Sequence, residues 1–113
     1  MRIFVIDTEY LTWNNSKSTN NSFFRIKKNP AEIIQVFVKE IFFKSKNEKL
    51  IYIKPSKYKS YPHRITRLTS IKKKFLDDKG IDFKFAYKIL LDFFPKKSII
   101  ISNGFEYKII DIN

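Results

Sequence analysis

The feature that most constrains the fold is an apolar run near the start of the chain, from Arg2 to Asp7, that is rich in β-branched side chains. Such a run is typical of a β-strand that is buried on both faces of a sheet. The 113 residues suit a single domain, and a chain of this length can still bury a working hydrophobic core. We therefore expect one domain, residues 1–113, built around this strand.

Two later segments also have the composition of strands, Glu32 to Phe43 and Leu50 to Ile53. The short link around Asn47 favours their pairing as an antiparallel hairpin. Between the first two strands, residues 10–30 are polar and rich in Asn and Ser, which is typical of a long loop. The first three strands would then form a meander.

Helical spacing begins after the third strand. Apolar positions favour a short helix from Ile65 to Ile71 and a longer one from Asp82 to Phe94, with Asp82 as its N-cap. Ser98 to Ser102 predicts a fourth strand, again buried on both faces, and Phe105 to Ile112 predicts a last helix. Because a helical crossover returns parallel and right-handed, the fourth strand should pair with the first. The sequence thus predicts an α/β fold with a mixed sheet.

Two acidic residues, Asp7 and Glu9, stand at the end of the first strand. Since side chains alternate between the two faces of a strand, both carboxylates should project to the same side and repel each other unless a cation lies between them. Oxygen-only ligands suit hard ions such as Mg²⁺ or Mn²⁺. The alternative is structural, because strands often end in polar residues and a D-x-E pattern also arises by chance.

Composition excludes several classes of site. The chain has no cysteine, which excludes disulfides, a thiol nucleophile and every zinc site that contains Cys. Its one histidine, His63, excludes a cluster of His ligands and is expected to be a partly exposed loop residue. The first apolar run is too short for a signal peptide, and no stretch approaches the roughly 20 apolar residues that span a bilayer. We expect a cytoplasmic protein that does not enter a membrane.

Five short segments resemble, in order, the motifs of one enzyme superfamily. Val5–Tyr10, followed by Thr12 and Trp13, resembles a D-x-E motif, and Ala31–Val36 resembles E-I-I-Q. Lys54–Pro55 resembles the end of V-x-P, Ile65–Ile71 resembles L-T-G-I, and Ser102–Glu106 resembles S-x-G-x-D. On these segments the sequence resembles the DEDD-type 3′-to-5′ exonucleases, which include proofreading exonucleases, RNase T and oligoribonuclease.

The resemblance implies a ribonuclease-H-like fold, in which a three-strand meander and a parallel fourth strand are flanked by helices. It implies hydrolysis of phosphodiester bonds at single-stranded 3′ ends of RNA or DNA, with two ions of Mg²⁺ or Mn²⁺. Asp7, Glu9 and Glu106 would be the catalytic and metal-binding residues. Thr8, Tyr10 and Trp13 would lie against the terminal nucleotide. Four basic side chains are further candidates for contacts with nucleic acid because of their charge, not because of the resemblance: Lys57, Lys59, Arg64 and Arg67.

The sequence departs from the family pattern at two places. The second-motif acid is Glu106 where the family usually has Asp, and its alternative role is that of an acid in the first turn of a helix. The third motif, H-x-A-x-x-D or its Tyr variant, is not in this sequence, and His63 precedes the second motif and cannot replace it. We therefore expect a C-terminally truncated domain with weak or no activity.

The positive charge is concentrated in one region. The net charge is +12, and residues 43–74 hold eleven basic side chains against one acidic. Three tyrosines interleave with them, Tyr52, Tyr58 and Tyr61, and such aromatic side chains can stack on unpaired bases. The region predicts a single-strand-binding face, or else a solvated lysine-rich surface. The alternative function is a catalytically inactive, basic nucleic-acid-binding module with the same fold.

Overall fold

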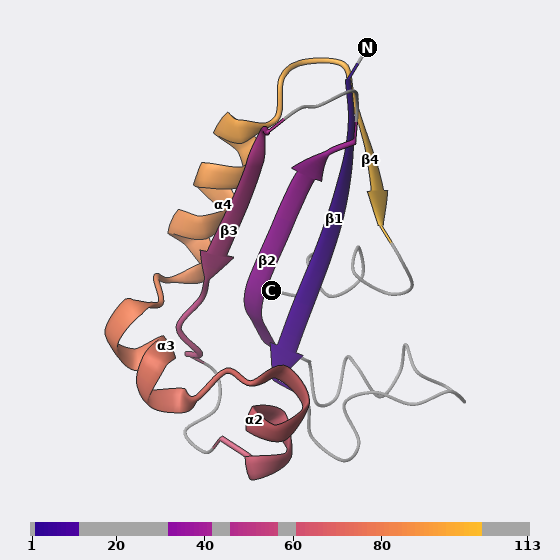
Figure 1. Ribbon diagram of the computed structural model, residues 1–113. Helices are drawn as coiled ribbons and strands as arrows, with labels where there is room; N and C mark the ends of the chain where they lie inside the picture. Colours follow the sequence, from indigo (N-terminus) through magenta and orange to yellow (C-terminus); the bar gives the residue numbers. More distant parts are fainter. Residues whose placement is uncertain (1, 12–31, 42–45, 57–60, 103–113) are drawn as a thin grey trace, which may run out of the picture.

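The computed structural model describes residues 2–11, 32–41, 46–56 and 61–102 (Figure 1). Its elements, in chain order, are β1 (Arg2–Leu11), β2 (Glu32–Glu40), β3 (Glu48–Tyr52), α2 (His63–Thr69), α3 (Lys73–Lys79), α4 (Phe83–Phe93) and β4 (Ser98–Ser102). The predicted 105–112 helix lies outside the described residues, as do Trp13, Lys57, Lys59 and Glu106.

The four strands form one mixed sheet in the order β3-β2-β1-β4. β1 pairs antiparallel with β2, and β2 pairs antiparallel with β3, which confirms the predicted meander. β4 pairs parallel with β1, with Ile6 opposite Ser102, so the predicted crossover is also confirmed. The central strand β1 therefore has a neighbour on each side.

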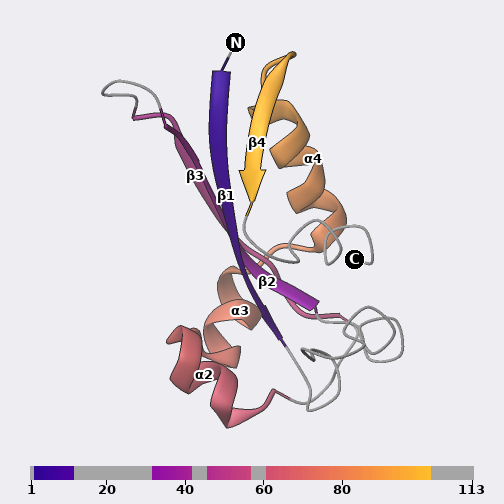
Figure 2. The ribbon, with the colours of Figure 1, turned by 90° about the vertical axis from the view of Figure 1, so that its right-hand side faces the viewer.

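Helix α4 covers one face of the sheet (Figure 2). The predicted N-cap is confirmed, since the Asp82 carboxylate accepts a hydrogen bond of 3.0 Å from the Phe85 backbone N–H. Ala86 and Leu90 of α4 are buried in one cluster with strand residues that include Phe4 and Ile6. This cluster is the larger part of the core.

Helices α2 and α3 lie against the opposite face, near the end of β1 (Figure 2). A second buried cluster joins the strands to these helices, and its members are Leu11, Ile34, Ile65, Ile71 and Leu76. The sheet is thus packed on both faces, but by different helices at different ends of its strands.

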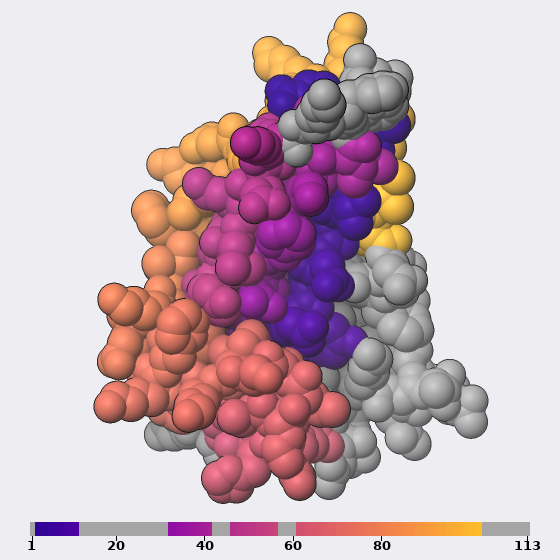
Figure 3. Space-filling model, viewed as in Figure 1, coloured from indigo at the N-terminus to yellow at the C-terminus, as the bar shows by residue number. Residues whose placement is uncertain are grey.

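The prediction that β1 and β4 are buried on both faces is wrong. Val5 is 36% exposed, and Ile99, Ile100 and Ile101 are 43–48% exposed. In β1 the buried residues alternate with exposed ones from Arg2 to Thr8, because α4 covers one face while α2 and α3 reach only the far end of the other. Figure 3 shows β1, β2 and β3 uncovered above α2 and α3, and we call this surface the open face.

Helix α3 was not predicted from the sequence. It has seven residues and buries a single side chain, Leu76, so its apolar spacing is too sparse to be recognised. Gly80 ends it in close contact with the segment that follows β3, where an added Cβ would lie 2.8 Å from the Lys54 backbone nitrogen. Among the described residues, no helix is long and apolar enough to cross a membrane.

Candidate active site at the end of strand β1

Asp7 and Glu9 lie on the same face of β1, as predicted, and this face is the open one. In the sheet register Asp7 is opposite Phe37 and Glu9 is opposite Gln35, whereas Phe4 and Ile6 belong to the cluster under α4. Asp7 is exposed and Glu9 is half-buried. Two carboxylates therefore share one side of the central strand, with no helix of the described residues between Asp7 and solvent.

A β-bulge shapes the sheet beside these acids. The register shifts between Glu9 and Tyr10, because Glu9 is opposite Gln35 while Tyr10 is opposite Ile33. The extra residue in β2 is Ile34, which belongs to the cluster beneath α2 and α3. Bulges re-aim side chains next to functional sites, and this one brings Ile34 together with Leu11, at the end of β1, beneath α2 and α3.

Thr8 and Tyr10 point to the other side of the sheet. Thr8 is 5% exposed, and within the described part of the chain its buried hydroxyl has no hydrogen-bond partner. Tyr10 is partly buried against the cluster under α4. Their assignment as nucleotide contacts stays a prediction, and any such contact would have to come from the backbone or from the strand end rather than from the open face.

The third predicted acid lies outside the described residues. β4 ends at Ser102, which is opposite Ile6 and therefore beside Asp7 on the neighbouring strand. Glu106 follows four residues later. Over the described ranges, no group of three or more His, Asp or Glu side chains comes together as a metal site. A role for Glu106 stays a prediction.

The pair of acids fits a hard divalent cation. Mg²⁺ is usually held by one or two protein carboxylates, with waters and substrate phosphates completing its ligands. Asp7 and Glu9 offer two carboxylates on one face of a strand, and Asp7 is open to solvent. These donors suit Mg²⁺ or Mn²⁺ and would leave ligand positions for a substrate.

Several described basic residues of the 43–74 region lie in or beside α2 and α3, the helices on the same side of the sheet as the acids (Figure 2). α2 carries Arg64, which is half-buried, and Arg67, which is exposed. His63 begins α2 and is exposed. Further exposed basic side chains come from the end of β3 and from the α2–α3 connection with the start of α3: Lys54, Lys72, Lys73 and Lys74. The described part of the predicted basic region is therefore largely exposed, and part of it lies on the side of the sheet that carries the β1 acids (Figure 2).

Tyr61 fixes the connection that follows α2. Its hydroxyl donates a hydrogen bond of 2.7 Å to the Ile71 carbonyl. Burial raises the pKa of the Tyr61 phenol, and a side-chain hydrogen bond with Thr69 lowers it by less. Tyr61, predicted from the sequence to be part of a base-stacking surface, is thus half-buried and holds the α2–α3 connection in place.

Phe75 is a neighbour of the site that the sequence analysis missed. Its ring lies 4.6 Å from that of Tyr52, centroid to centroid, at an interplanar angle of 83°. Tyr52 is one of the tyrosines of the basic region, whereas Phe75 lies on α3, a helix that the apolar spacing does not predict. The tertiary contact between β3 and α3 creates this pair.

Two solved structures resemble this chain over nearly its whole length. The nuclease domain of 3′hExo, a DEDDh family member bound to rAMP, matches with a TM-score of 0.73 and 18% identity, covering 98% of this chain and 56% of that chain. Cell-death related nuclease 4 (CRN-4) matches with a TM-score of 0.67 and 14% identity, covering 93% of this chain and 36% of that chain. No family model and no curated protein matches the sequence.

These matches establish the fold. The chain has the ribonuclease-H-like fold of DEDDh exonuclease domains, which confirms the fold expected from the sequence motifs. It spans about half the length of the first of these chains and about a third of the second.

Proposed function

We propose that this chain is the part of a 3′-to-5′ exonuclease domain that carries the first catalytic acids. It would act on single-stranded 3′ ends of RNA or DNA, with Asp7 and Glu9 binding Mg²⁺ or Mn²⁺. The observation that carries the proposal is the pair of acids on the open face of β1, at the end of the central strand of a sheet with the fold of DEDDh nucleases. Glu106 would complete the metal ligands from the segment after β4.

The bound ions would activate the attacking water and stabilise the leaving oxygen of the phosphodiester. The chain's own residues bind and position. Asp7 and Glu9 bring negative charge to the point where the ions bind, and the exposed cations Arg67 and Lys54 attract the phosphates of the strand from the same side of the sheet. Since H-x-A-x-x-D is not in this sequence, no general base is assigned, and we expect weak turnover from this chain.

Metal binding is the sharpest test of this proposal, because it does not depend on turnover. We expect Asp7→Asn to lower the affinity for Mn²⁺, measured by electron paramagnetic resonance or calorimetry, by at least about tenfold, since loss of even an indirect metal partner typically costs that much. Asp92→Asn changes an exposed acid of α4 on the other side of the sheet and is the matched control. Equal Mn²⁺ affinity in wild type and Asp7→Asn would refute the metal site.

A second candidate function is a catalytically inactive module that binds single strands. It is favoured by the concentration of basic residues at 43–74 and by the exposure of the described ones. This module would bind single-stranded oligonucleotides with or without Mg²⁺, and Asp7→Asn would not change its affinity. A 5′-labelled oligonucleotide that is shortened from its 3′ end by wild type in Mn²⁺, and not by Asp7→Asn, would exclude this candidate.

A further inference from the structure

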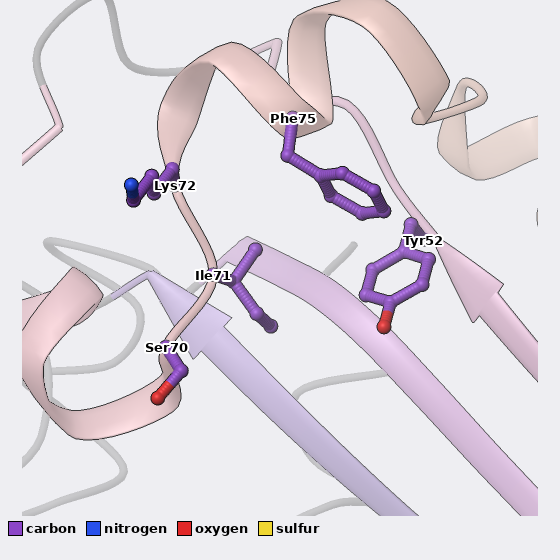
Figure 4. A pocket seen from close by; sticks show the side chains of 5 residues that line it. All are labelled: Tyr52, Ser70, Ile71, Lys72 and Phe75. Carbon is purple, nitrogen blue, oxygen red and sulfur yellow. The ribbon is translucent and has the colours of Figure 1, made fainter.

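A cavity of about 270 Å³ lies between the end of β3 and the α2–α3 connection (Figure 4). Its lining residues are Tyr52, Ser70, Ile71, Lys72 and Phe75. The volume is close to the lower end of the range for small-molecule pockets, about 300 Å³. Three of the five residues are apolar or aromatic, one is a cation and one a hydroxyl, which is the kind of lining that binds an aromatic ring with an anionic group attached.

The aromatic side chains give the cavity a stacking surface. Figure 4 shows the Tyr52 and Phe75 rings side by side, on the side of the cavity away from Ser70. The two rings are nearly perpendicular, at 83°, and Phe75 remains 40% exposed although it is a large apolar side chain. An exposed aromatic face beside a cavity suits a planar ligand, because base–aromatic stacking tolerates every nucleobase.

The charge around the cavity favours an anion. Lys72 lines it, and Lys74 and Lys54 are exposed on the adjoining segments. Lys73 is paired with Asp77 at 2.7 Å, whereas among the described residues Lys72 makes no ion pair. An unpaired lysine at the rim of an aromatic cavity is placed to attract a phosphate next to a stacked ring.

The sheet register connects the cavity to the candidate active site. Glu9 is opposite Gln35, and Gln35 is opposite Tyr52, so these three residues form one row across β1, β2 and β3 on the open face. Neighbouring strands lie about 4.8 Å apart, which places the Tyr52 backbone about 10 Å from that of Glu9. One single strand can therefore reach both places.

From these observations we propose that the cavity is a nucleotide subsite: it stacks an unpaired nucleobase on Tyr52 and Phe75 and attracts the adjoining phosphate with Lys72. The inference deepens the proposed function and rests on it for the nature of the ligand. The bound nucleotide is an internal one, held to the side of the 3′ end that Asp7 and Glu9 would process. The subsite gives the single strand a fixed path across the open face.

The test is a titration of the ¹⁵N-labelled chain with AMP, with ribose 5-phosphate as the probe that lacks a base. It is run without divalent metal and in the Asp7→Asn variant as well, so that the β1 acids do not contribute. We expect AMP to shift the amides of residues 70–72 and 75 in both proteins, and ribose 5-phosphate to shift them much less. Equal shifts from the two probes, or AMP shifts confined to other elements, would overturn the subsite.

Two variants test base stacking and phosphate attraction at the subsite separately. Phe75→Leu should weaken AMP binding by about 5- to 150-fold, the loss that corresponds to one base stacked on an aromatic ring. The matched control is Phe85→Leu, at another exposed phenylalanine, on α4, and it should bind AMP as wild type does. Lys72→Gln should weaken binding of AMP but not of adenosine. An unchanged AMP affinity in Phe75→Leu contradicts the proposal.

The same experiments separate this proposal from the proposed function. If Asp7→Asn and wild type bind Mn²⁺ equally but AMP still shifts the amides of residues 70–72, the exonuclease assignment is refuted and the subsite is supported. If Mn²⁺ binding depends on Asp7 but AMP causes no shifts at the cavity, the subsite is refuted and the exonuclease assignment is supported. An acidic peptide that produces the same shifts as AMP, and competes with it, would show that the cavity is a protein-binding site and would overturn the proposal.

Discussion

At the scale of single residues, the side of the sheet on which each side chain lies decides its role. Asp7 and Glu9 face the open side, while Thr8 is buried on the side of α4. This alternation is a property of any extended strand, so the spacing of the two acids was enough to predict that they lie on one face. The burial of Thr8 could not be predicted, because the sequence does not say which face of a strand a helix will cover.

Tyr61 gives a pH-dependent prediction at this scale. Because its pKa is raised in the folded protein, the folded state keeps the proton at pH values where the unfolded chain, with a pKa near 10.0, loses it. The stabilisation is therefore complete below pH 10 and is lost as the pH rises above 10, through the raised pKa of the folded protein. We expect Tyr61→Phe to lower the free energy of unfolding at pH 7, measured with urea, by about 1 kcal/mol, since the variant lacks the hydrogen bond to the Ile71 carbonyl.

The difference between the two proteins should then shrink above pH 10, since the variant has no phenol to titrate at this position. Circular dichroism at each pH follows the transitions. A difference in the free energy of unfolding that stays constant from pH 8 to pH 11 would contradict the shifted pKa.

At the scale of elements, the ends of the helices depend on specific backbone contacts. α2 ends at Ser70, which has φ 61° and ψ 13°, and whose N–H donates to the Thr66 carbonyl at 2.8 Å. This is the position at which the DEDD-type motif L-T-G-I has glycine. α3 ends at Gly80, where the backbone of Ile53 and Lys54, just after β3, lies too close for a side chain. The helix predicted from the sequence ran to Ile71, so neither end could be read from the apolar spacing.

Ser70→Gly should stabilise the protein. A non-glycine residue in the left-handed region costs about 1–2 kcal/mol, and the greater freedom of glycine in the unfolded chain offsets about 0.4–1 kcal/mol of the gain. We expect a net increase of about 0.5–1 kcal/mol in the free energy of unfolding, measured by urea titration. Lys97→Gly, at φ 63°, should act in the same direction. A loss of stability in Ser70→Gly would show that the serine side chain itself stabilises the turn.

At the scale of the whole molecule, the two faces of the sheet differ in charge and in cover. α4 packs over one face, and the open face on the other side carries the β1 acids with the exposed cations of α2 and α3 close to it. Apolar side chains such as Val5 and Leu50 also remain exposed there, at 36% and 50%. The molecule thus has carboxylates, exposed cations and aromatic rings on one side, and these are the groups that the proposed function and the proposed subsite would use.

This distribution predicts how nucleic-acid binding depends on salt. For single strands, log K falls by about 0.7 per unit of log salt concentration for each phosphate contacted. Arg67→Gln should therefore reduce the slope by about 0.7 in fluorescence anisotropy with an oligonucleotide. Lys88→Gln removes an exposed cation of α4, on the far side of the sheet, and should leave the slope unchanged. Equal slopes in all three proteins would place the bound strand elsewhere.

The sequence by itself determined the strand order, the parallel crossover, the N-cap of α4 and the placement of Asp7 and Glu9 on one face of β1. The N-cap and the two acids depend on short spacing, whereas the strand order and the crossover follow from the rules by which strands and helices connect. Only the tertiary structure decided which faces are buried, where α3 lies and which side chains meet Tyr52. Burial and contacts between distant segments depend on how whole layers pack, and an apolar run such as Ile99 to Ile101 looks the same in a covered strand as in an exposed one.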